Sequence, residues 1–321
     1  MNETTTGTDV ALAAHGLHVR FGAARAVDGV ELEIGSGEIV ALVGESGCGK
    51  TTLARSMLGL IRPAEGSVQH GSRPLSYAKS ALKDFRRHVQ LVLQDPTGSL
   101  NPRHTVYEAV AEGLRIHGIG DEETRVADAL AKAGLRPAER FFLRYPHELS
   151  GGQRQRVVIA GALVLEPDVL VADEPVSSLD ASVRGEILAL LLTLRAELGL
   201  SVLVVTHDLG LAWNIADRVA VMYLGRIVET GPTAEVLLTP RHPYTKALLS
   251  VVPEINKLDP IVLVGETPDP SRIPVGCRFR PRCPAYAAGL PEPIAARCET
   301  DPPAVLPADR GHHAACHLTE A

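Results

Sequence analysis

The segment Gly44–Thr51 constrains the fold of this chain more than any other. Its letters, GESGCGKT, fit the pattern G-x-x-x-x-G-K-[ST], and they stand between an apolar run, Glu38–Val43, and a helix-like stretch, Thr51–Leu60. Glycines let a backbone fold round a phosphate group, and the first amides of the following helix face the same charge. The pattern therefore predicts a strand–loop–helix unit that binds a nucleoside triphosphate.

Each residue type in this loop has an expected task. The Lys50 ammonium reaches the β- and γ-phosphates, and the Thr51 hydroxyl binds Mg²⁺. Cys48 contributes its backbone only, because its side chain does not have to touch phosphate. The predicted contacts with the nucleotide are Gly44, Glu45, Ser46, Gly47, Cys48, Gly49, Lys50, Thr51 and Thr52.

Two carboxylates follow a second apolar run, in DVLVADE, which ends at Asp173 and Glu174. Burying a strand that ends in two acids costs free energy unless a cation or catalysis uses them. We expect Asp173 to hold Mg²⁺ through water and Glu174 to polarise an attacking water. The competing interpretation is a solvated strand end.

Short β-branched runs alternate with helix-like segments, a pattern typical of an α/β fold with ligands at the carboxyl ends of its strands. Predicted strands are Glu38–Val43, Val169–Ala172 and Val202–Val205. Predicted helices are Thr51–Leu60, Gln153–Leu165 and Val183–Leu198. The alternating runs Leu17–Phe21 and Val30–Ile34 indicate a small N-terminal antiparallel sheet. Residues 95–155 contain the helical patterns Val106–Ile116 and Glu122–Ala133, which predict an inserted α-helical subdomain.

Composition narrows the functional class. The 321 residues carry 32 basic and 38 acidic side chains, a net charge of −6, and only 4% aromatics. Such a chain is not a polycation that grips nucleic acid by bulk charge, and we expect no nucleic-acid partner. The longest apolar run, Val157–Leu165, is about half of the ~18 residues that span a bilayer, and the N-terminus lacks the pattern of a signal peptide.

Proline marks a change of character near Gly231–Pro232. Eight of the 23 prolines lie in residues 1–231 and fifteen in the last 90 residues, which also hold four of the five cysteines. This shift predicts a loop-rich, cysteine-containing C-terminal tail. The expected division is a disordered N-terminus (1–12), an ATPase domain (13–235) and a C-terminal extension (236–321).

The segment Leu149–Gln153, LSGGQ, resembles the signature of ABC-type ATPases. Gln94 in VLQDP, Asp180 in SLD and His207 in VVTHD accompany it in the order and spacing of that family, across about residues 15–235. The resemblance implies a P-loop NTPase core of ABC type. It also implies that Ser150, Gly151, Gly152 and Gln153 of one subunit cover the γ-phosphate held by the loop of another, so that ATP joins a head-to-tail dimer.

The resemblance assigns further roles. Phe21 stacks on adenine, although a core Phe in the small sheet is an equal interpretation. Gln94 senses Mg²⁺ and the attacking water, His207 contacts the γ-phosphate, and Asp180 communicates across the dimer. The implied catalytic residues are Glu174, His207, Gln94 and Lys50, and the implied Mg²⁺ ligands are Thr51, Gln94 and Asp173.

A narrower resemblance covers the rest of the chain. The segments 94–114, RHPYTKALLSVVP (241–253) and VGCRFRPRC (275–283) are similar to ATPase subunits of oligopeptide and dipeptide importers. This implies a peripheral place on the cytoplasmic face of the cell membrane, a related but non-identical second ATPase subunit, two transmembrane permease subunits and, indirectly, an extracytoplasmic solute-binding protein. Alternatives are an importer of another solute, such as a nickel chelate, and a soluble ABC ATPase that acts on ribosomes or DNA.

Four thiols are spaced through the tail as Cys277, Cys283, Cys298 and Cys316. A tail with few apolar residues gains stability when its side chains coordinate a metal. Zinc sites usually space their first pair of ligands by ~2–4 residues, and Cys277 and Cys283 are further apart than that. A [4Fe-4S] cluster tolerates looser spacing. The resemblance to the importer subunits also implies such a cluster. Cluster ligation, zinc ligation and unligated thiols all remain open here, as does a sensor role for the tail.

Overall fold

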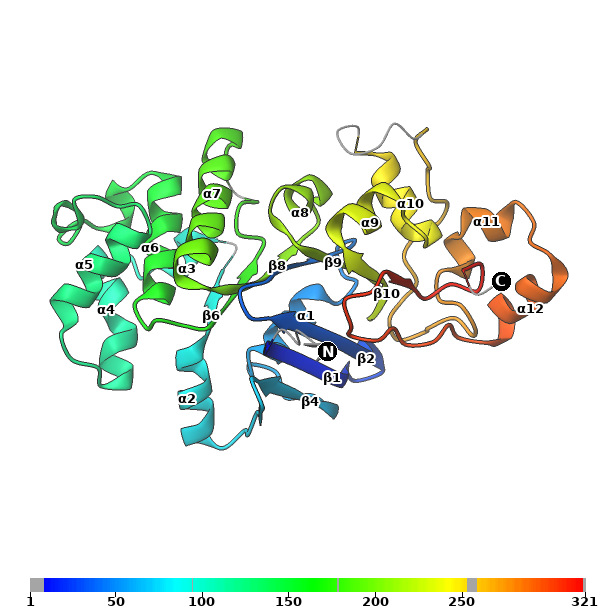
Figure 1. The fold of residues 1–321 in the computed structure, drawn as a ribbon, viewed down its shortest axis with the longest axis horizontal. Coiled ribbons are helices and arrows are strands. Elements are labelled where there is room, and N and C mark those ends of the chain that lie inside the picture. Colours follow the sequence, from blue (N-terminus) through cyan, green and yellow to red (C-terminus); the bar gives the residue numbers. More distant parts are fainter. Residues whose placement is uncertain (1–8, 94, 178, 253–258, 320–321) are drawn as a thin grey trace, which may run out of the picture. The chain divides into compact units, whose positions relative to one another are not determined.

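The computed structural model describes residues 9–93, 95–177, 179–252 and 259–319 (Figure 1). The strands are β1 (Val10–Phe21), β2 (Ala24–Gly35), β3 (Ile39–Val43), β4 (Glu65–His70), β5 (Arg73–Pro74), β6 (Val89–Val92), β7 (Val169–Asp173), β8 (Ser201–Thr206), β9 (Arg218–Tyr223), β10 (Arg226–Pro232) and β11 (His313–Ala314). The helices are α1 (Lys50–Met57), α2 (Lys79–His88), α3 (Pro96–Ser99), α4 (Val106–His117), α5 (Glu122–Lys132), α6 (Gly151–Leu163), α7 (Ala181–Leu198), α8 (Leu209–Ile215), α9 (Thr233–Leu238), α10 (Pro243–Ser250), α11 (Pro284–Ala287) and α12 (Glu292–Thr300). Short 3-10 helices are η1 (Ala138–Arg140), η2 (Pro146–Glu148) and η3 (Arg280–Arg282).

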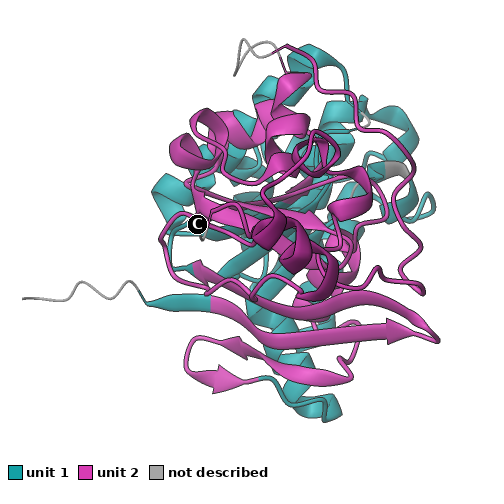
Figure 2. Ribbon diagram, turned by 90° about the vertical axis from the view of Figure 1, so that its right-hand side faces the viewer, with its two compact units in different colours: residues 1–11, 35–38, 75–204 teal, residues 12–34, 39–74, 205–321 magenta. Residues whose placement is uncertain are grey.

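The chain divides into two compact units (Figure 2). Unit 1 consists of Met1–Ala11, Gly35–Glu38 and Leu75–Val204. Unit 2 consists of Leu12–Ile34, Ile39–Pro74 and Val205–Ala321. The phosphate loop therefore belongs to unit 2, and the acidic pair and the LSGGQ segment belong to unit 1.

An antiparallel sheet in unit 2 has the order β2-β1-β4-β5. β1 pairs with β4 in a register that places Leu12 opposite His70 and Ala14 opposite Val68. The predicted run Leu17–Phe21 covers only the last part of β1, because the stretch from Ala11 to Ala14 is buried without interruption and shows no alternation. β1 also begins at Val10, inside the range 1–12 that was expected to be disordered, while residues 1–8 lie outside the description.

Unit 2 also contains four strands in the order β11-β10-β9-β3. β3 runs parallel to β9, and β9 and β10 form an antiparallel pair. All residues of β3 and of β9 are buried, so the valine-rich sequences supply branched side chains to both faces. β9 and β10 were not predicted from the sequence, because a run buried on both faces lacks a period of two and, unlike β3 and β7, these runs lead into no motif that marks a strand end.

Unit 1 combines strands in the order β8-β7-β6 with the helical segment that follows. β6 and β7 are parallel, and α4 and α5 both pack against α6. The predicted helix Val106–Ile116 is observed as α4, whose Thr105 and Glu108 form a reciprocal capping box. The α/β class with an N-terminal antiparallel sheet and an inserted helical part is therefore confirmed.

The C-terminal extension carries the short helices α10, α11 and α12 between long loops (Figure 1). Its Tyr244 and Phe279 are buried against Tyr223 of β9, with ring centroids 4.8 Å and 5.2 Å from the Tyr223 ring. These three rings share one hydrophobic cluster with Val43 of β3. The extension is thus part of the core beneath the phosphate loop.

Candidate nucleotide-binding site

The phosphate loop follows β3 and needs glycine at its two ends. Gly44 has a φ of 153° and Gly49 a φ of 110°, values that other residues rarely adopt. A Cβ at either position would lie 2.2 Å from a backbone oxygen, that of Met222 or that of Ala26. Because a backbone oxygen lies so close, only glycine fits at either position.

The loop leads directly into α1, whose amino end is arranged for an anion. Gly49 is the N-cap, and among the described residues of this helix start there is neither a side-chain cap nor an acid in the first turn. Amides at such an end and the helix dipole favour a phosphate. Thr51 and Thr52 are half-buried in this first turn, while Ser46 and Gly47 are exposed at the loop tip.

Lys50 bends back over the loop. Its Nζ donates to the carbonyl oxygens of Gly44 at 2.7 Å and Glu45 at 2.9 Å, and lies 4.0 Å from the Cys48 sulfur. The Lys50 side chain is 7% exposed and Cys48 is 2% exposed. Burial raises the pKa of the Cys48 thiol despite the nearby ammonium, so Cys48 stays neutral. A buried ammonium at the loop's mouth is suited to neutralise phosphate charge.

Two further predicted residues of unit 2 lie at strand ends. Phe21 ends β1 and is 56% exposed, so it is not the core residue of the alternative interpretation. An exposed ring is available to stack on a base. His207 follows β8 directly and is exposed, at the carboxyl end of a buried strand.

The acidic pair of unit 1 ends β7. Asp173 is 8% exposed as the last residue of the strand. Glu174 is half-buried and has a φ of 50°, a left-handed conformation that is unfavourable for a residue with a side chain. Such conformations concentrate at functional sites. The chain turns sharply here and carries two carboxylates at the strand's carboxyl end.

The LSGGQ segment forms the start of α6. Ser150 is the N-cap: its Oγ accepts from the Gln153 amide at 3.2 Å, and Gln153 Oε1 accepts from the Ser150 amide at 3.0 Å. This reciprocal pair is the capping box that the S-x-x-Q pattern encodes. Gly152 has no room for a side chain, since a Cβ there would lie 2.6 Å from Val183 of α7. The absence of a side chain at Gly152 therefore lets the start of α6 pack closely against α7.

Asp180 caps the next helix, α7. One carboxylate oxygen accepts from the Val183 amide at 3.0 Å and from the Ser182 hydroxyl at 2.8 Å. The Val183 amide bond and the Ser182 bond hold the pKa of Asp180 below its usual range, so the side chain is a carboxylate at neutral pH. Gln94, a predicted ligand, lies outside the described residues.

Comparisons with known proteins decide the family. Residues 27–177 match the family described as ABC transporter, and residues 228–288 match the C-terminal region of oligopeptide/dipeptide transporters. The chain is 41% identical to the Bacillus subtilis oligopeptide transport ATP-binding protein AppF over 93% of this chain and 91% of the relative. It is 44% identical to the Haemophilus influenzae dipeptide transport ATP-binding protein DppF over 84% of each. This chain is an ABC transporter ATPase.

Solved structures agree with this family. A Clostridium perfringens protein, cbiO1, which is part of the ABC transporter complex cbiONQ, covers 77% of this ATPase with a TM-score of 0.67 and 31% identity, and 97% of that chain is matched. The dimeric ATP-binding cassette MJ0796, bound to ADP and phosphate, covers 69% with a TM-score of 0.61 and 31% identity, and 98% of it is matched. The ABC-type core and the ATPase activity predicted from the sequence are therefore confirmed.

Three residues that contact the phosphate loop of this ABC ATPase were missed by sequence reasoning. Tyr244, Thr267 and Arg282 all contact Glu45 from the C-terminal extension. The segments HPYT and VGCRFRPRC contain two of them, but nothing in these segments indicates which residue they contact. The contacts become visible only when positions 199 to 237 residues apart are placed together.

The four tail thiols of the ABC ATPase lie within electrostatic reach of one another. Burial raises the pKa of Cys277 and Cys298, and raises that of Cys316 to about 12. Charge on the other three thiols adds to the shift at Cys316. Among the described residues, no group of three or more His, Cys, Asp or Glu side chains is placed to hold one metal ion.

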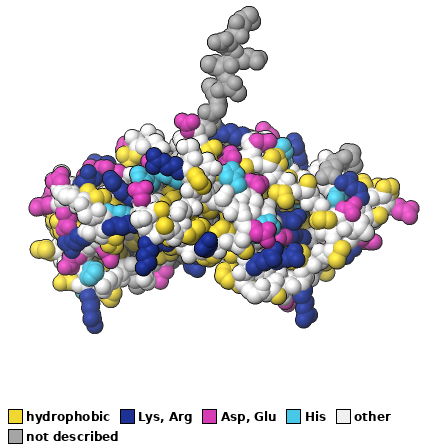
Figure 3. Space-filling model, turned by 90° about the horizontal axis from the view of Figure 1, so that it is seen from below, with side chains coloured by type: hydrophobic (Ala, Val, Ile, Leu, Met, Phe, Trp, Pro, Cys, Tyr) yellow, Lys and Arg dark blue, Asp and Glu magenta, His cyan; other side chains and the backbone are white. Residues whose placement is uncertain are grey.

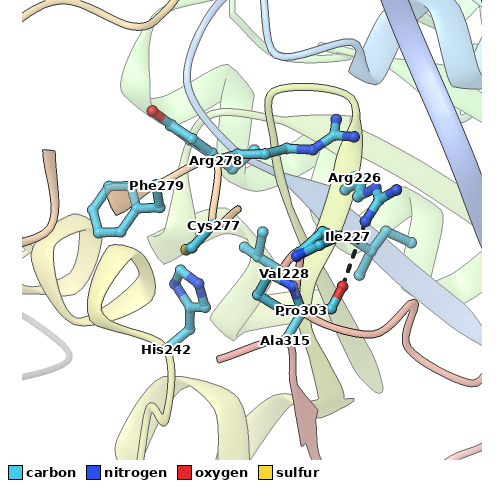
Figure 4. Close-up of a pocket in the computed structure, with 11 residues that line it drawn as sticks. Arg226, Ile227, Val228, His242, Cys277, Arg278, Phe279, Pro303 and Ala315 are labelled. Carbon is cyan, nitrogen blue, oxygen red and sulfur yellow. Dashed lines mark hydrogen bonds between the residues drawn. The ribbon is translucent and has the colours of Figure 1, made fainter. Parts of the chain in front are cut away.

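A small cavity of about 30 Å³ lies beside Cys277 (Figure 4). His242 of the HPYT segment lines it together with Cys277 and Phe279. Complete burial lowers the pKa of His242 to about 3, so the ring is neutral. His242 Nδ1 accepts from the Tyr244 amide at 3.0 Å, which leaves the hydrogen on Nε2. The histidine of this segment is therefore a helix cap that fixes Tyr244.

The surface carries mixed charge. On the face shown in Figure 3, basic side chains lie interleaved with acidic ones, with hydrophobic side chains scattered between them. This face is not the continuous basic surface on which nucleic acid binds. In the described part of the chain, no helix combines the length and the apolar character needed to cross a membrane.

Proposed function

We propose that this ABC ATPase energises an importer of oligopeptides or dipeptides from the cytoplasmic face of the membrane. The observation that carries the proposal is the joint match to an ABC cassette and to the oligopeptide/dipeptide transporter C-terminal region in one chain. The names of AppF and DppF, matched over most of both chains, support the same substrate class.

In this proposal the residues divide the work by chemistry. The glycine loop and the α1 amides bind the triphosphate, Lys50 neutralises its β- and γ-oxygens, and Phe21 stacks on the base. Thr51 and Asp173, with Gln94, supply the oxygen ligands that Mg²⁺ prefers. Glu174 accepts a proton from the attacking water, and His207 contacts the γ-phosphate. The helix end capped by Ser150 faces the nucleotide of a second subunit, and Asp180 communicates across the dimer.

The partners follow from the same arrangement. The amino ends of α1 and α6 are two separate helix ends without an acidic residue in the first turn, which suits each of them to bind an anion. We expect each ATP to lie between the phosphate loop of one subunit and the Ser150–Gln153 segment of its neighbour, a related ATPase chain. Two permease subunits and, through them, an extracytoplasmic solute-binding protein complete the importer.

The four tail thiols are the candidate ligands of a metal centre. Charge on Cys277, Cys283 and Cys298 acts on Cys316, so the four thiols share one region of the tail. A [4Fe-4S] cluster is held by four cysteine thiolates and tolerates a looser spacing than the first ligand pair of a usual zinc site. We therefore propose Cys277, Cys283, Cys298 and Cys316 as ligands of a [4Fe-4S] cluster with a structural or regulatory role.

The transport proposal is tested by co-expressing the chain with permease subunits of an oligopeptide or dipeptide importer and reconstituting the complex in vesicles. We expect peptide-stimulated ATP hydrolysis in the presence of the binding protein, and at least about 100-fold less hydrolysis with Lys50→Ala, since the phosphate loses its charge partner. Recovery of no permease, or salt-sensitive binding to ribosomes or DNA instead, contradicts the proposal. If a nickel chelate stimulates ATP hydrolysis and peptides do not, the transported solute is a nickel chelate and not a peptide.

The cluster proposal needs a separate measurement. Anaerobic purification should yield visible absorbance with about four irons and four sulfides per chain, which is the composition of such a cluster. Stoichiometric zinc without iron, or neither metal, would overturn this assignment and leave the nucleotide site untouched.

A further inference from the structure

Glu45, the second residue of the phosphate loop, is held on three sides by the C-terminal extension. Arg282 donates to both carboxylate oxygens, from Nη1 to Oε2 at 2.7 Å and from Nη2 to Oε1 at 3.1 Å. Thr267 Oγ1 donates to Oε2 at 3.1 Å. The Glu45 backbone amide donates to the Tyr244 hydroxyl at 2.9 Å. We call Tyr244, Thr267 and Arg282 the loop clamp.

The clamp is sheltered from water. The Arg282 side chain is 9% exposed and the Glu45 side chain 28%, and the Arg282 guanidinium lies 6.0 Å from the centre of the Tyr223 ring. Tyr244 is fully buried. A two-pronged arginine–carboxylate pair in such surroundings is geometrically specific and stronger than an exposed ion pair.

Glu45 connects the clamp to the phosphate-binding lysine. The Glu45 carbonyl accepts from Lys50 Nζ at 2.9 Å, while the Glu45 amide and side chain are fixed by the clamp. Movement of Glu45 therefore moves a direct partner of Lys50. Burial alone would raise the pKa of Glu45, but the bonds and charge of Arg282 outweigh it, so the carboxylate stays ionised and paired.

The charge balance explains why the loop needs a cation here. A carboxylate in a loop that binds a triphosphate repels its ligand unless another group neutralises it. Arg282 supplies this neutralisation. Because Arg282 neutralises Glu45, the positive charge of Lys50 remains available for the phosphates of the nucleotide.

Arg282 is placed by the thiol segment. It ends η3, whose first residue, Arg280, donates its amide to the Cys277 carbonyl at 3.1 Å, while the Cys283 amide donates to the Arg280 carbonyl at 3.2 Å. The Cys277 amide in turn donates to the Cys298 carbonyl at 2.9 Å. Two cysteines thus stand at the two ends of the turn that carries Arg282.

We propose that Arg282 is a positioning residue for ATP: it neutralises and orients Glu45, and through Glu45 it places Lys50 for the phosphates. This inference rests on the proposed nucleotide site and adds to it a function for the C-terminal extension. The extension, which the ABC transporter match does not cover, completes the phosphate loop of its own chain.

The test measures ATP affinity and steady-state hydrolysis of the full-length chain. Arg282→Gln removes both arginine bonds and leaves the Glu45 carboxylate without its counter-charge beside the phosphates, so we expect ATP to bind about tenfold more weakly. KM for ATP should rise by a similar factor, with kcat at saturating ATP changed less than about twofold. Arg282→Lys, which keeps the charge, should recover part of the loss.

A double variant separates this role from a merely structural one. Glu45→Gln in the Arg282→Gln background removes the unpaired carboxylate, so affinity should return to within about threefold of the wild-type chain. Arg280→Gln, on the same turn but with its guanidinium 5.9 Å from the centre of the Tyr286 ring, is the matched control and should bind ATP as the wild-type chain does. Thermal melting identifies any variant that fails to fold. If Arg282→Gln does not fold, the ATP affinities of Arg282→Lys and of the double variant are compared with that of the wild-type chain instead.

Three results overturn the inference. They are unchanged ATP affinity in folded Arg282→Gln, an equal loss in Arg280→Gln, or a double variant as weak as Arg282→Gln alone. The proposed nucleotide site fails separately, if Lys50→Ala binds ATP as tightly as the wild-type chain does.

Discussion

At the scale of single residues, the strain at Glu174 is informative. Its φ of 50° costs about 1–3 kcal/mol for a residue with a side chain, and the same left-handed conformation occurs at Glu166, after α6. Glu166 lies in a surface turn, where its carboxylate is 3.2 Å from Arg125. Glu174 instead follows a buried strand beside Asp173. Glu166 therefore shares the backbone strain of Glu174 but not its place at the end of a buried strand. A comparison of the two residues tests whether the strain or the position matters for hydrolysis.

Replacing Glu174 with glutamine should block hydrolysis while preserving ATP binding. The amide keeps the shape and the backbone strain but cannot accept the proton, and loss of a general base costs about 10²–10⁴ in rate. Single-turnover hydrolysis and ATP titration measure the two effects. Glu166→Gln is the control and should hydrolyse normally, and hydrolysis by Glu174→Gln near the wild-type rate would refute the assignment.

At the scale of elements, two helices of unit 1 start in the same way. Ser150 caps α6 and Thr105 caps α4, each with a reciprocal partner at the third helical position. Both boxes stabilise a helix end, but only that of α6 belongs to the LSGGQ segment. The same substitution at both N-caps therefore distinguishes an effect on stability from an effect on ATP hydrolysis.

We predict that Ser150→Ala and Thr105→Ala each lower the free energy of unfolding by about 0.5–2 kcal/mol, the usual effect of losing an N-cap. Only Ser150→Ala should also reduce ATP hydrolysis, since its hydroxyl faces the neighbour's nucleotide in the proposed dimer. Denaturant titration and ATPase assays check the pair. Equal activity in the two variants would contradict the role of Ser150.

The elements also show what the sequence could and could not reveal. The S-x-x-Q and T-x-x-E patterns are local, so both helix starts were predictable within one or two residues. β9 and β10 lacked both a period of two and a following motif of the kind that marks the ends of β3 and β7. The partners of Glu45 were not predictable, because Arg282 is 237 residues away and an arginine in a turn has no local signature of its target.

At the scale of the whole chain, a second long-range ion pair joins the first strands to the extension. Arg278 and Asp28 are paired with side chains 8% and 5% exposed, and Arg226 lies 3.5 Å from the same carboxylate. Arg278 also donates to the Leu224 carbonyl at 2.6 Å. Burial would raise the pKa of Asp28, but the arginines outweigh it and keep the carboxylate ionised.

Asp28→Asn should destabilise the protein by about 3–5 kcal/mol, because it leaves Arg278 buried without its counter-charge. The measurement is thermal or denaturant unfolding. Asp128→Asn, which removes an exposed pair with Lys132, is the matched control and should cost only about 0.3–0.5 kcal/mol. A similar small loss in both variants would show that Asp28 does not hold the extension.

The clamp on Glu45 has a consequence for the order of events during synthesis. The phosphate loop leaves the ribosome long before Tyr244, Thr267 and Arg282 are made. A nascent or prematurely terminated chain that ends before them therefore presents a loop whose carboxylate is still uncompensated. On the proposed role of Arg282, such an incomplete chain binds ATP more weakly than the full-length protein does.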